Sequence, residues 1–321
     1  MRLRPEPPPG TLARGPTKGT RMPKASNGSV EIEWDERGDP GAPAVLLIMG
    51  LGGQMTRWTD EFMGALVAHG LRPIRFDNRD VGLSTKFEGH GLPSLTAIGA
   101  AMMMGRTPAT PYTLEEMAGD AVAVLDAAGV ARAHVVGVSM GGMIAQLVAA
   151  GHPERVLTLT SIMSTTGNPA LPRPTAEANA VLTSRPQGTD MATLVAHGVK
   201  AAQVIGSPGY PTDEAVLAER IRSDAERMHY PAGFQRQLAA IMANGDRRPR
   251  LTGIKAPTLV IHGTDDPLVP VEGGRDTAAS IPGARLVEIE GMGHDLPSAL
   301  IGRITDLIAE HARQATTAKA A

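Results

Sequence analysis

The chain has 321 residues, which allows one large α/β domain with an insertion or two ordinary domains. Its 31 Lys and Arg face 33 Asp and Glu, so the net charge of −2 provides no overall field that favours nucleic acid or an anionic membrane as a partner. Cysteine is absent, which excludes disulfides, thiolate nucleophiles and Cys-ligated metal sites, and nothing requires an oxidising compartment.

Residues 1–28 differ in composition from the rest of the chain. They hold six Lys and Arg against one acid, a net of +5 that leaves −7 on the remainder, and six of them are proline. With almost no bulky apolar residue, this stretch cannot offset ordering entropy by burial, so we expect a disordered, Pro-rich basic tail. No apolar run before Val30 resembles a signal peptide and none elsewhere could span a bilayer, which predicts a cytoplasmic protein.

From residue 29 onward, short β-type runs alternate with longer helical patterns. Residues 30–34 alternate apolar and polar side chains, as a half-buried edge strand would. The continuous apolar run at 44–49 is typical of a strand buried on both faces of a parallel sheet. Further strands are predicted at 72–76, 134–138, 156–159, 258–261 and 285–289.

Helical patterns lie between most of these strands. Thr113 and Glu116 have the spacing of a capping box at the start of one helix, and Gly129 is a fitting end for it. Strands that alternate with helices imply an α/β fold with a mostly parallel central sheet flanked by helices. The strand signals disappear between residues 166 and 249, which predicts a helical cap inserted between the core segments 29–165 and 250–316.

Residues 137–141 read Gly-Val-Ser-Met-Gly and match the G-x-S-x-G pattern of a nucleophile elbow. A predicted strand precedes the motif and a helical run follows it, which is the context that the motif requires. Glycine on both sides of Ser139 permits the sharp turn that presents the hydroxyl. Because a serine hydroxyl is a weak nucleophile, it needs a base and an orienting acid, in the chain order Ser, Asp or Glu, His.

Candidates for the acid and the base follow late strands. Asp265 and Asp266 come after the strand at 258–261, and the residues alone leave the choice between them open. Among nine histidines, His294 alone lies in a glycine-flanked loop after a late strand. His229, in the insertion, could contact substrate as a lid residue, although an ordinary surface histidine is the commoner case.

With these motifs in place, the chain resembles an α/β-hydrolase from residue 29 to about 315. Its segments 49–52, 77–84, 137–141 and 291–294 are similar to those of the aclacinomycin methylesterase group of serine esterases. In that family the acid stands three residues after the strand-end glycine. The resemblance therefore implies a catalytic triad of Ser139, Asp266 and His294.

The resemblance also implies an oxyanion hole formed by the backbone N–H groups of Leu51 and Met140. Gly50 is expected to let the backbone approach the substrate closely. Trp58 either forms a wall of the substrate pocket or packs in the core. Met102, in a run of three methionines, belongs either to an apolar substrate site or to a methionine-filled core.

Together these features predict a serine carboxylic-ester hydrolase that forms an acyl-enzyme with a small to medium, largely apolar ester such as a methyl ester or a lactone. Amidase or aminopeptidase, C–C hydrolase and perhydrolase chemistry stay open, because the same triad supports each. A non-catalytic ligand receptor on the same scaffold is the alternative of another class. We expect no metal and no cofactor, a small-molecule ester as partner rather than nucleic acid or membrane, and leave a homo-oligomer open.

Overall fold

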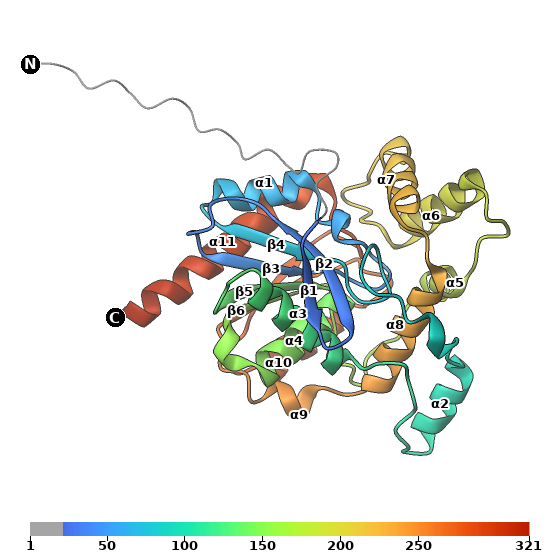
Figure 1. Cartoon of the computed structure of the whole chain (residues 1–321), viewed down its shortest axis with the longest axis horizontal. Helices are drawn as coiled ribbons and strands as arrows, with labels where there is room; N and C mark the ends of the chain where they lie inside the picture. The colour runs from blue at the N-terminus through green and yellow to red at the C-terminus, as the bar shows by residue number, and fades with distance from the viewer. Residues whose placement is uncertain (1–21, 321) are drawn as a thin grey trace, which may run out of the picture.

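An eight-stranded sheet forms the centre of residues 22–320, the part of the chain that the computed structural model describes, with side chains to residue 315 (Figure 1). The strand order is β1-β2-β4-β3-β5-β6-β7-β8. β1, β2 and β4 pair antiparallel, and all neighbours from β4 to β8 pair parallel. The strands are β1 Lys24–Asn27, β2 Val30–Glu36, β3 Ala44–Ile48, β4 Arg72–Phe76, β5 Ala133–Val138, β6 Val156–Ile162, β7 Thr258–Gly263 and β8 Arg285–Ile289.

The prediction of a disordered tail over 1–28 was wrong for its last residues. β1 pairs with β2 through a two-residue Gly28-Ser29 turn, and Ala25 is 1% exposed. β1 rather than β2 is thus the edge strand. A Gly-Ser pair between two β-type runs is a hairpin signal. The first run, residues 24–27, becomes buried only by pairing with β2 and packing on its neighbours, and the basic, Pro-rich composition of the segment gives no sign of that burial. Residues 1–21 of the predicted tail lie outside the described residues.

Helices cover both faces of the sheet. On β3, Leu46 and Ile48 pack into one apolar cluster with α3 and α4, while Val45 and Leu47 pack into a second with α1 and α11. This two-sided burial explains the continuous apolar run of β3. The helices and 3₁₀ turns that belong to the sheet domain are α1 Asp60–Ala68, α2 Leu95–Met103, α3 Leu114–Ala127, α4 Met140–Gly151, α9 Arg248–Leu251, α10 Glu272–Ser280, α11 Ser298–Ala320, η1 Met55–Arg57, η2 Glu88–His90 and η3 Pro153–Arg155.

The start of α3 has the predicted capping box. Thr113 Oγ1 accepts from the Glu116 N–H at 3.1 Å, and Glu116 Oε2 accepts from the Thr113 N–H at 2.8 Å. Gly129, with a φ of +67°, follows the last turn. The prediction of an α/β fold with a mostly parallel sheet is confirmed. No helix among residues 22–320 combines the length and the apolar content needed to cross a bilayer.

Four of the five helices between β6 and β7, which we call the cap, lie in the segment expected to be a helical insertion. They are α5 Ala176–Thr183, α6 Met191–Ile205, α7 Glu214–Arg227 and α8 Pro231–Asn244. α6 and α7 share a small apolar cluster of Val195, Val199 and Leu217. α8 contacts α2 and α3, so it joins the cap to the sheet domain, and α5 to α7 stand to one side of the sheet (Figure 1).

Candidate active site

Ser139 lies at the sharp turn between β5 and α4. Its φ of 54° and ψ of −120° fall in a region that L-residues rarely adopt. The turn forms because its neighbours lack side chains. A Cβ at Gly141 would overlap the carbonyl oxygen of Ile48 on β3, and a Cβ at Gly137 would overlap that of Gly141. The backbone therefore holds the Ser139 hydroxyl at the carboxyl end of β5.

Ser139, His294 and Asp266 form a hydrogen-bonded chain. Ser139 Oγ lies 3.0 Å from His294 Nε2, and His294 Nδ1 lies 2.7 Å from Asp266 Oδ2. The three side chains follow β5, β8 and β7, whose carboxyl ends meet at one edge of the sheet although 155 positions separate serine from histidine. With its proton on Nδ1, the imidazole presents an unprotonated Nε2 to the Ser139 hydroxyl. The arrangement can remove a proton from the serine.

Asp266 is held as an anion. Its Oδ1 accepts from the N–H groups of Leu268 and Val269 at 2.9 and 2.8 Å, and the residue is 6% exposed. Burial raises the pKa of Asp266, but the charge of His294 and the hydrogen bonds outweigh burial and keep this pKa well below its usual range. An ionised Asp266 can fix the tautomer of the imidazole and stabilise its protonated form.

Asp265, the alternative acid, points elsewhere. It is exposed, and its Oδ2 accepts from Thr264 Oγ1 at 2.6 Å and from the Gly291 N–H at 2.9 Å. Asp265 thus stabilises the turn before His294, and Asp266 is the carboxylate that contacts the imidazole.

His262 lies behind Asp266. Its Nε2 donates to the carbonyl oxygen of Val269 at 2.7 Å and is 3.6 Å from Asp266 Oδ2, too far for a hydrogen bond. The ring is fully buried, and its Nδ1 has no partner within residues 22–320. His262 therefore holds the Asp266 loop rather than the reacting groups.

The loop after β3 lies against Ser139. A Cβ at Gly50 would be 3.2 Å from Ser139 Cβ, and the Gly53 N–H donates to the Gly50 carbonyl at 3.1 Å to close a turn around Leu51. Met140 is the first residue of α4, so its N–H has no acceptor within the helix. Leu51 and Met140, the predicted oxyanion donors, thus belong to the two backbone segments that flank the serine.

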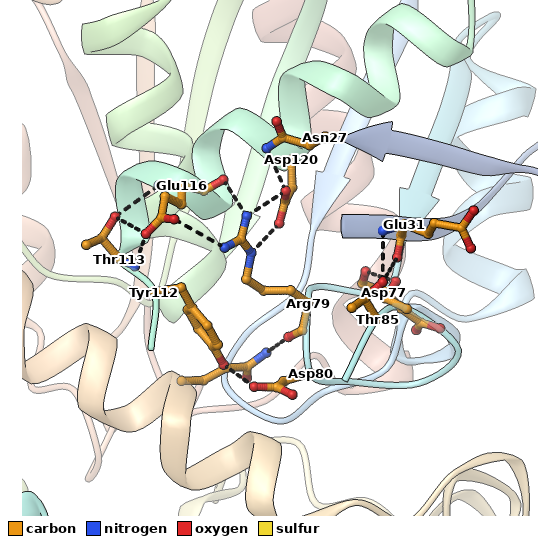
Figure 2. Close-up of polar contacts among 12 residues, drawn as sticks. Asn27, Glu31, Asp77, Arg79, Asp80, Thr85, Tyr112, Thr113, Glu116 and Asp120 are labelled. Carbon is orange, nitrogen blue, oxygen red and sulfur yellow. Dashed lines mark hydrogen bonds and ion pairs between the residues drawn. The ribbon is translucent and has the colours of Figure 1, made fainter. Parts of the chain in front are cut away.

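Buried ion pairs hold the loop after β4 (Figure 2). Arg79 donates to both carboxylate oxygens of Asp120 on α3 at 2.6 and 2.8 Å. Asp80, with a φ of 66°, accepts from the Tyr112 hydroxyl at 2.8 Å and pairs with Arg236 of α8 at 3.2 Å. Burial raises the pKa of Tyr112, which keeps this hydroxyl a donor. These buried pairs fix the loop after β4 to α3 and to α8.

A cleft of about 240 Å³ lies between the cap and the core loops. Gly52, which follows Leu51, and Arg57 line its core side, while Leu194, His197, Met228 and His229 are among its cap residues. A larger hollow of about 410 Å³ is bordered by Glu115, His152 and Arg250, and neither Ser139, Asp266 nor His294 lines this hollow or the smaller cleft. We associate function with the smaller cleft because it borders the loop of the predicted oxyanion donor.

Residues 43–297 match the family model described as the alpha/beta hydrolase fold. This chain belongs to the α/β-hydrolase family. The resemblance inferred from its motifs is confirmed, and the chain is a hydrolase.

The relatives of this α/β-hydrolase include several enzymes. It is 34% identical to the rhodomycin D methylesterase DauP of a Streptomyces species, over 88% of this chain and 95% of that one. It is 31% identical to the putative carbamate hydrolase RutD of Variovorax paradoxus, over 74% and 80% of the two chains. The solved enol-lactonase of Burkholderia xenovorans has a TM-score of 0.63 and 26% identity, with 92% and 100% coverage.

The predicted substrate contacts of this α/β-hydrolase have different outcomes. Gly50 lies beside Ser139, and His229 lines the cleft. Trp58 packs in the core, because its fully buried ring lies 4.9 Å from that of Phe62. Met102 is not a core residue, since it is 38% exposed on α2, and it is not among the residues that line the cleft, so its contact with substrate stays a prediction.

Sequence reasoning missed the residues that join cap and core. Asp224 of α7 pairs with Arg57, and Arg227 pairs with Asp77 at 2.7 Å. A charged helix such as α7 is normally solvated, so its composition carries no signal for this role. Only the Asp-Asn-Arg-Asp cluster at 77–80 could have suggested a loop held by buried charge.

Proposed function

We propose that this α/β-hydrolase is a serine carboxylic-ester hydrolase that works through an acyl-enzyme. The observation that carries the proposal is the hydrogen-bonded chain from Ser139 through His294 to Asp266, with links of 3.0 and 2.7 Å. A serine with a strained backbone, a base within hydrogen-bond reach and a buried carboxylate behind that base have the geometry needed for nucleophilic catalysis.

The first half of the reaction forms the acyl-enzyme. His294 Nε2 takes the hydroxyl proton as Ser139 Oγ bonds to the ester carbonyl carbon, and Asp266 stabilises the resulting imidazolium. The N–H groups of Leu51 and Met140 bind the developing oxyanion, each with an effect of about 3 kcal/mol on the barrier. His294 then donates the proton to the leaving oxygen. The C–O bond breaks, and the alcohol departs.

The second half releases the acid. A water molecule gives a proton to His294 and adds to the acyl carbon, and the same two N–H groups bind the second oxyanion. The proton passes from His294 to Ser139 Oγ as the acyl C–O bond breaks. A carboxylic acid leaves, and the free serine is restored. The cycle consumes one water per ester and needs no further reactant.

The substrate class we propose is a small to medium, largely apolar ester, with a methyl ester or a lactone preferred. The names of two relatives, a methylesterase and an enol-lactonase, support this range. The cleft supports it too: apolar Leu194, Ile221 and Met228 occur beside Arg57, which is neutralised by Asp224. Because the one arginine among the described residues that line this cleft is already paired, a substrate carboxylate would lose its hydration there without gaining an ion pair, which disfavours its binding.

The test is a hydrolysis panel. Nitrophenyl esters of increasing acyl length, methyl esters and lactones should be hydrolysed by the wild type and not by Ser139→Ala, whose circular dichroism should be unchanged. A fluorophosphonate probe should label the wild type at Ser139 and leave Ser139→Ala unlabelled. Equal hydrolysis by both proteins would contradict the proposal.

The same panel separates the alternatives. Amide, C–C or peracid chemistry would appear as faster turnover of the matching substrates than of any ester. A ligand receptor would bind esters without a burst of nitrophenol. A cytoplasmic location, a small-molecule ester as the partner and a homo-oligomer stay predictions of the sequence.

A further inference from the structure

The loop that carries His294 is attached to the cap as well as to the core. The segment 205–210, between α6 and α7, lies along it. The His294 N–H donates to the carbonyl oxygen of Ile205 at 2.7 Å, and the Gly209 N–H donates to the Gly291 carbonyl at 2.9 Å. A Cβ at Gly293 would overlap the backbone of this segment. The two backbones are in direct contact, with no space for a side chain between them.

Ser207 is the side chain at the centre of this contact. It is 3% exposed. Its Oγ accepts from the Gly293 N–H at 2.9 Å and donates to Asp295 Oδ1 at 2.5 Å. One hydroxyl thereby connects the residue before His294 to the residue after it, and its single proton and one of its lone pairs are both used.

The histidine loop needs such support. Glycine at 291 and 293 gives its backbone wide conformational freedom, and Gly291 has a φ of +74°. The core holds the loop through buried Met292, whose carbonyl accepts from the Asp265 N–H at 3.1 Å, and through the Asp265 carboxylate, which accepts from the Gly291 N–H at 2.9 Å. Proton transfer requires His294 Nε2 to stay within about 3 Å of Ser139 Oγ, and small displacements of a base reduce rates strongly.

We propose that Ser207 is a positioning residue for the base of the reaction, through which the cap keeps His294 aligned with Ser139. This inference rests on the proposed function. Among the described residues, the Ser207 hydroxyl makes no hydrogen bond to the side chains of Ser139, His294 or Asp266, so it acts through the backbone at Gly293 and the carboxylate of Asp295. The cap therefore contributes to the chemical step as well as to the cleft.

The test measures the rate at which a fluorophosphonate probe labels Ser139, together with the final labelled fraction. Labelling needs the serine and its base but no particular ester. We expect Ser207→Ala to label about tenfold more slowly and still reach full labelling, with kcat reduced in parallel and KM within about twofold on a nitrophenyl ester. Ser207→Thr, which keeps the hydroxyl, should restore most of the rate. Ser223→Ala, an exposed serine on α7, is the matched control and should equal the wild type.

Asp295→Ala removes the other end of the bridge. Asp295→Ala should slow labelling to a similar degree. The double variant Ser207→Ala/Asp295→Ala should label only slightly more slowly than either single variant, because each of the three proteins lacks the same hydrogen bond between Ser207 and Asp295. If Ser207→Ala does not fold, the labelling rate of Asp295→Ala tests the positioning role in its place.

Other outcomes overturn the inference. Wild-type labelling rates in Ser207→Ala and Asp295→Ala would show that the bridge does not align the base. A smaller labelled fraction at the wild-type rate would mean that Ser207 serves only folding. A wild type that the probe does not label would refute the proposed function, and the positioning role with it, whereas a labelled wild type with unaffected variants refutes the positioning role alone.

Discussion

Arg227, the last residue of α7, has a guanidinium nitrogen 2.7 Å from the fully buried carboxylate of Asp77 on the loop after β4. On the same helix Asp224 pairs with Arg57, next to the loop after β3. The segment 205–210 contacts the loop after β8. Because β4 and β8 lie on opposite sides of β5 in the sheet, the cap is attached on both sides of the strand that precedes Ser139.

Arg227→Ala should destabilise the protein by roughly 1–3 kcal/mol, because it leaves the Asp77 carboxylate buried with only the N–H groups of Met55 and Leu83 as partners. Urea unfolding measures this loss. Arg222→Ala is the control, since Arg222 is exposed and lies 3.9 Å from Glu219, and it should change stability by less than about 0.5 kcal/mol. Equal effects would mean that the Arg227–Asp77 pair is no stronger than a surface pair.

Two glycines of α4 should respond in opposite ways to alanine. At Gly141 the added methyl overlaps the Ile48 carbonyl, so Gly141→Ala should cost more than about 3 kcal/mol or prevent folding. At Gly151, the last residue of the helix, a Cβ meets no atom, and alanine should stabilise by about 0.5 kcal/mol. Thermal unfolding of both variants is the measurement, and a stable Gly141→Ala would contradict the close contact between β3 and α4.

Neighbouring carboxylates should differ in their effect on catalysis. Asp266→Asn should lower kcat by about 10³–10⁴ without unfolding the protein, because the amide no longer stabilises protonated His294. Asp265→Asn keeps an oxygen for the Gly291 N–H and should retain activity within about tenfold. Steady-state kinetics on one nitrophenyl ester compares them. A larger loss in Asp265→Asn would make Asp265 the triad acid.

Buried His134 should make the free energy of unfolding depend on pH. Burial, with a smaller effect of His311, lowers the pKa of His134 to about 4, and its Nδ1 lies 2.9 Å from Thr158 Oγ1. The unfolded chain, with an ordinary pKa of about 6.5, takes up this proton first as the pH falls. The stabilisation by neutral His134 is therefore full above pH 6.5 and is lost between pH 6.5 and about 4, on the order of 3 kcal/mol.

Unfolding free energies measured across this pH range provide the test. His134→Gln, which keeps a polar group near Thr158 but does not titrate, should have a shallower slope than the wild type between pH 6.5 and 4. Parallel slopes in the two proteins would exclude His134 as the source of the acid sensitivity.

Local patterns were enough for much of the fold and for part of the site. The apolar run of β3, the Thr113 capping box and the elbow at Ser139 are each encoded by adjacent residues, because burial on both faces, capping and a sharp turn have local requirements. His294 could be selected for the same reason, from its glycine-flanked loop after a strand.

Contacts between segments that are distant in the sequence could not be predicted from local patterns. β1 gains its structure from pairing with β2, and the exposure of Met102 depends on how α2 packs against α8. The residues alone left Asp265 and Asp266 equivalent, since one step along a loop reverses the direction of a side chain. The residues around Ser207 and Arg227 in the sequence do not indicate the contacts of these two side chains, because a serine or an arginine in a helical insertion is defined by the distant residues that it contacts in the fold.

The sequence by itself determined that this is an α/β-hydrolase with serine at its elbow, because strand and turn signals are properties of consecutive residues. The family resemblance of the sequence also favoured Asp266 over Asp265. That the cap holds the histidine loop was decided only by the tertiary structure, because this relationship depends on distances between atoms that the chain order separates.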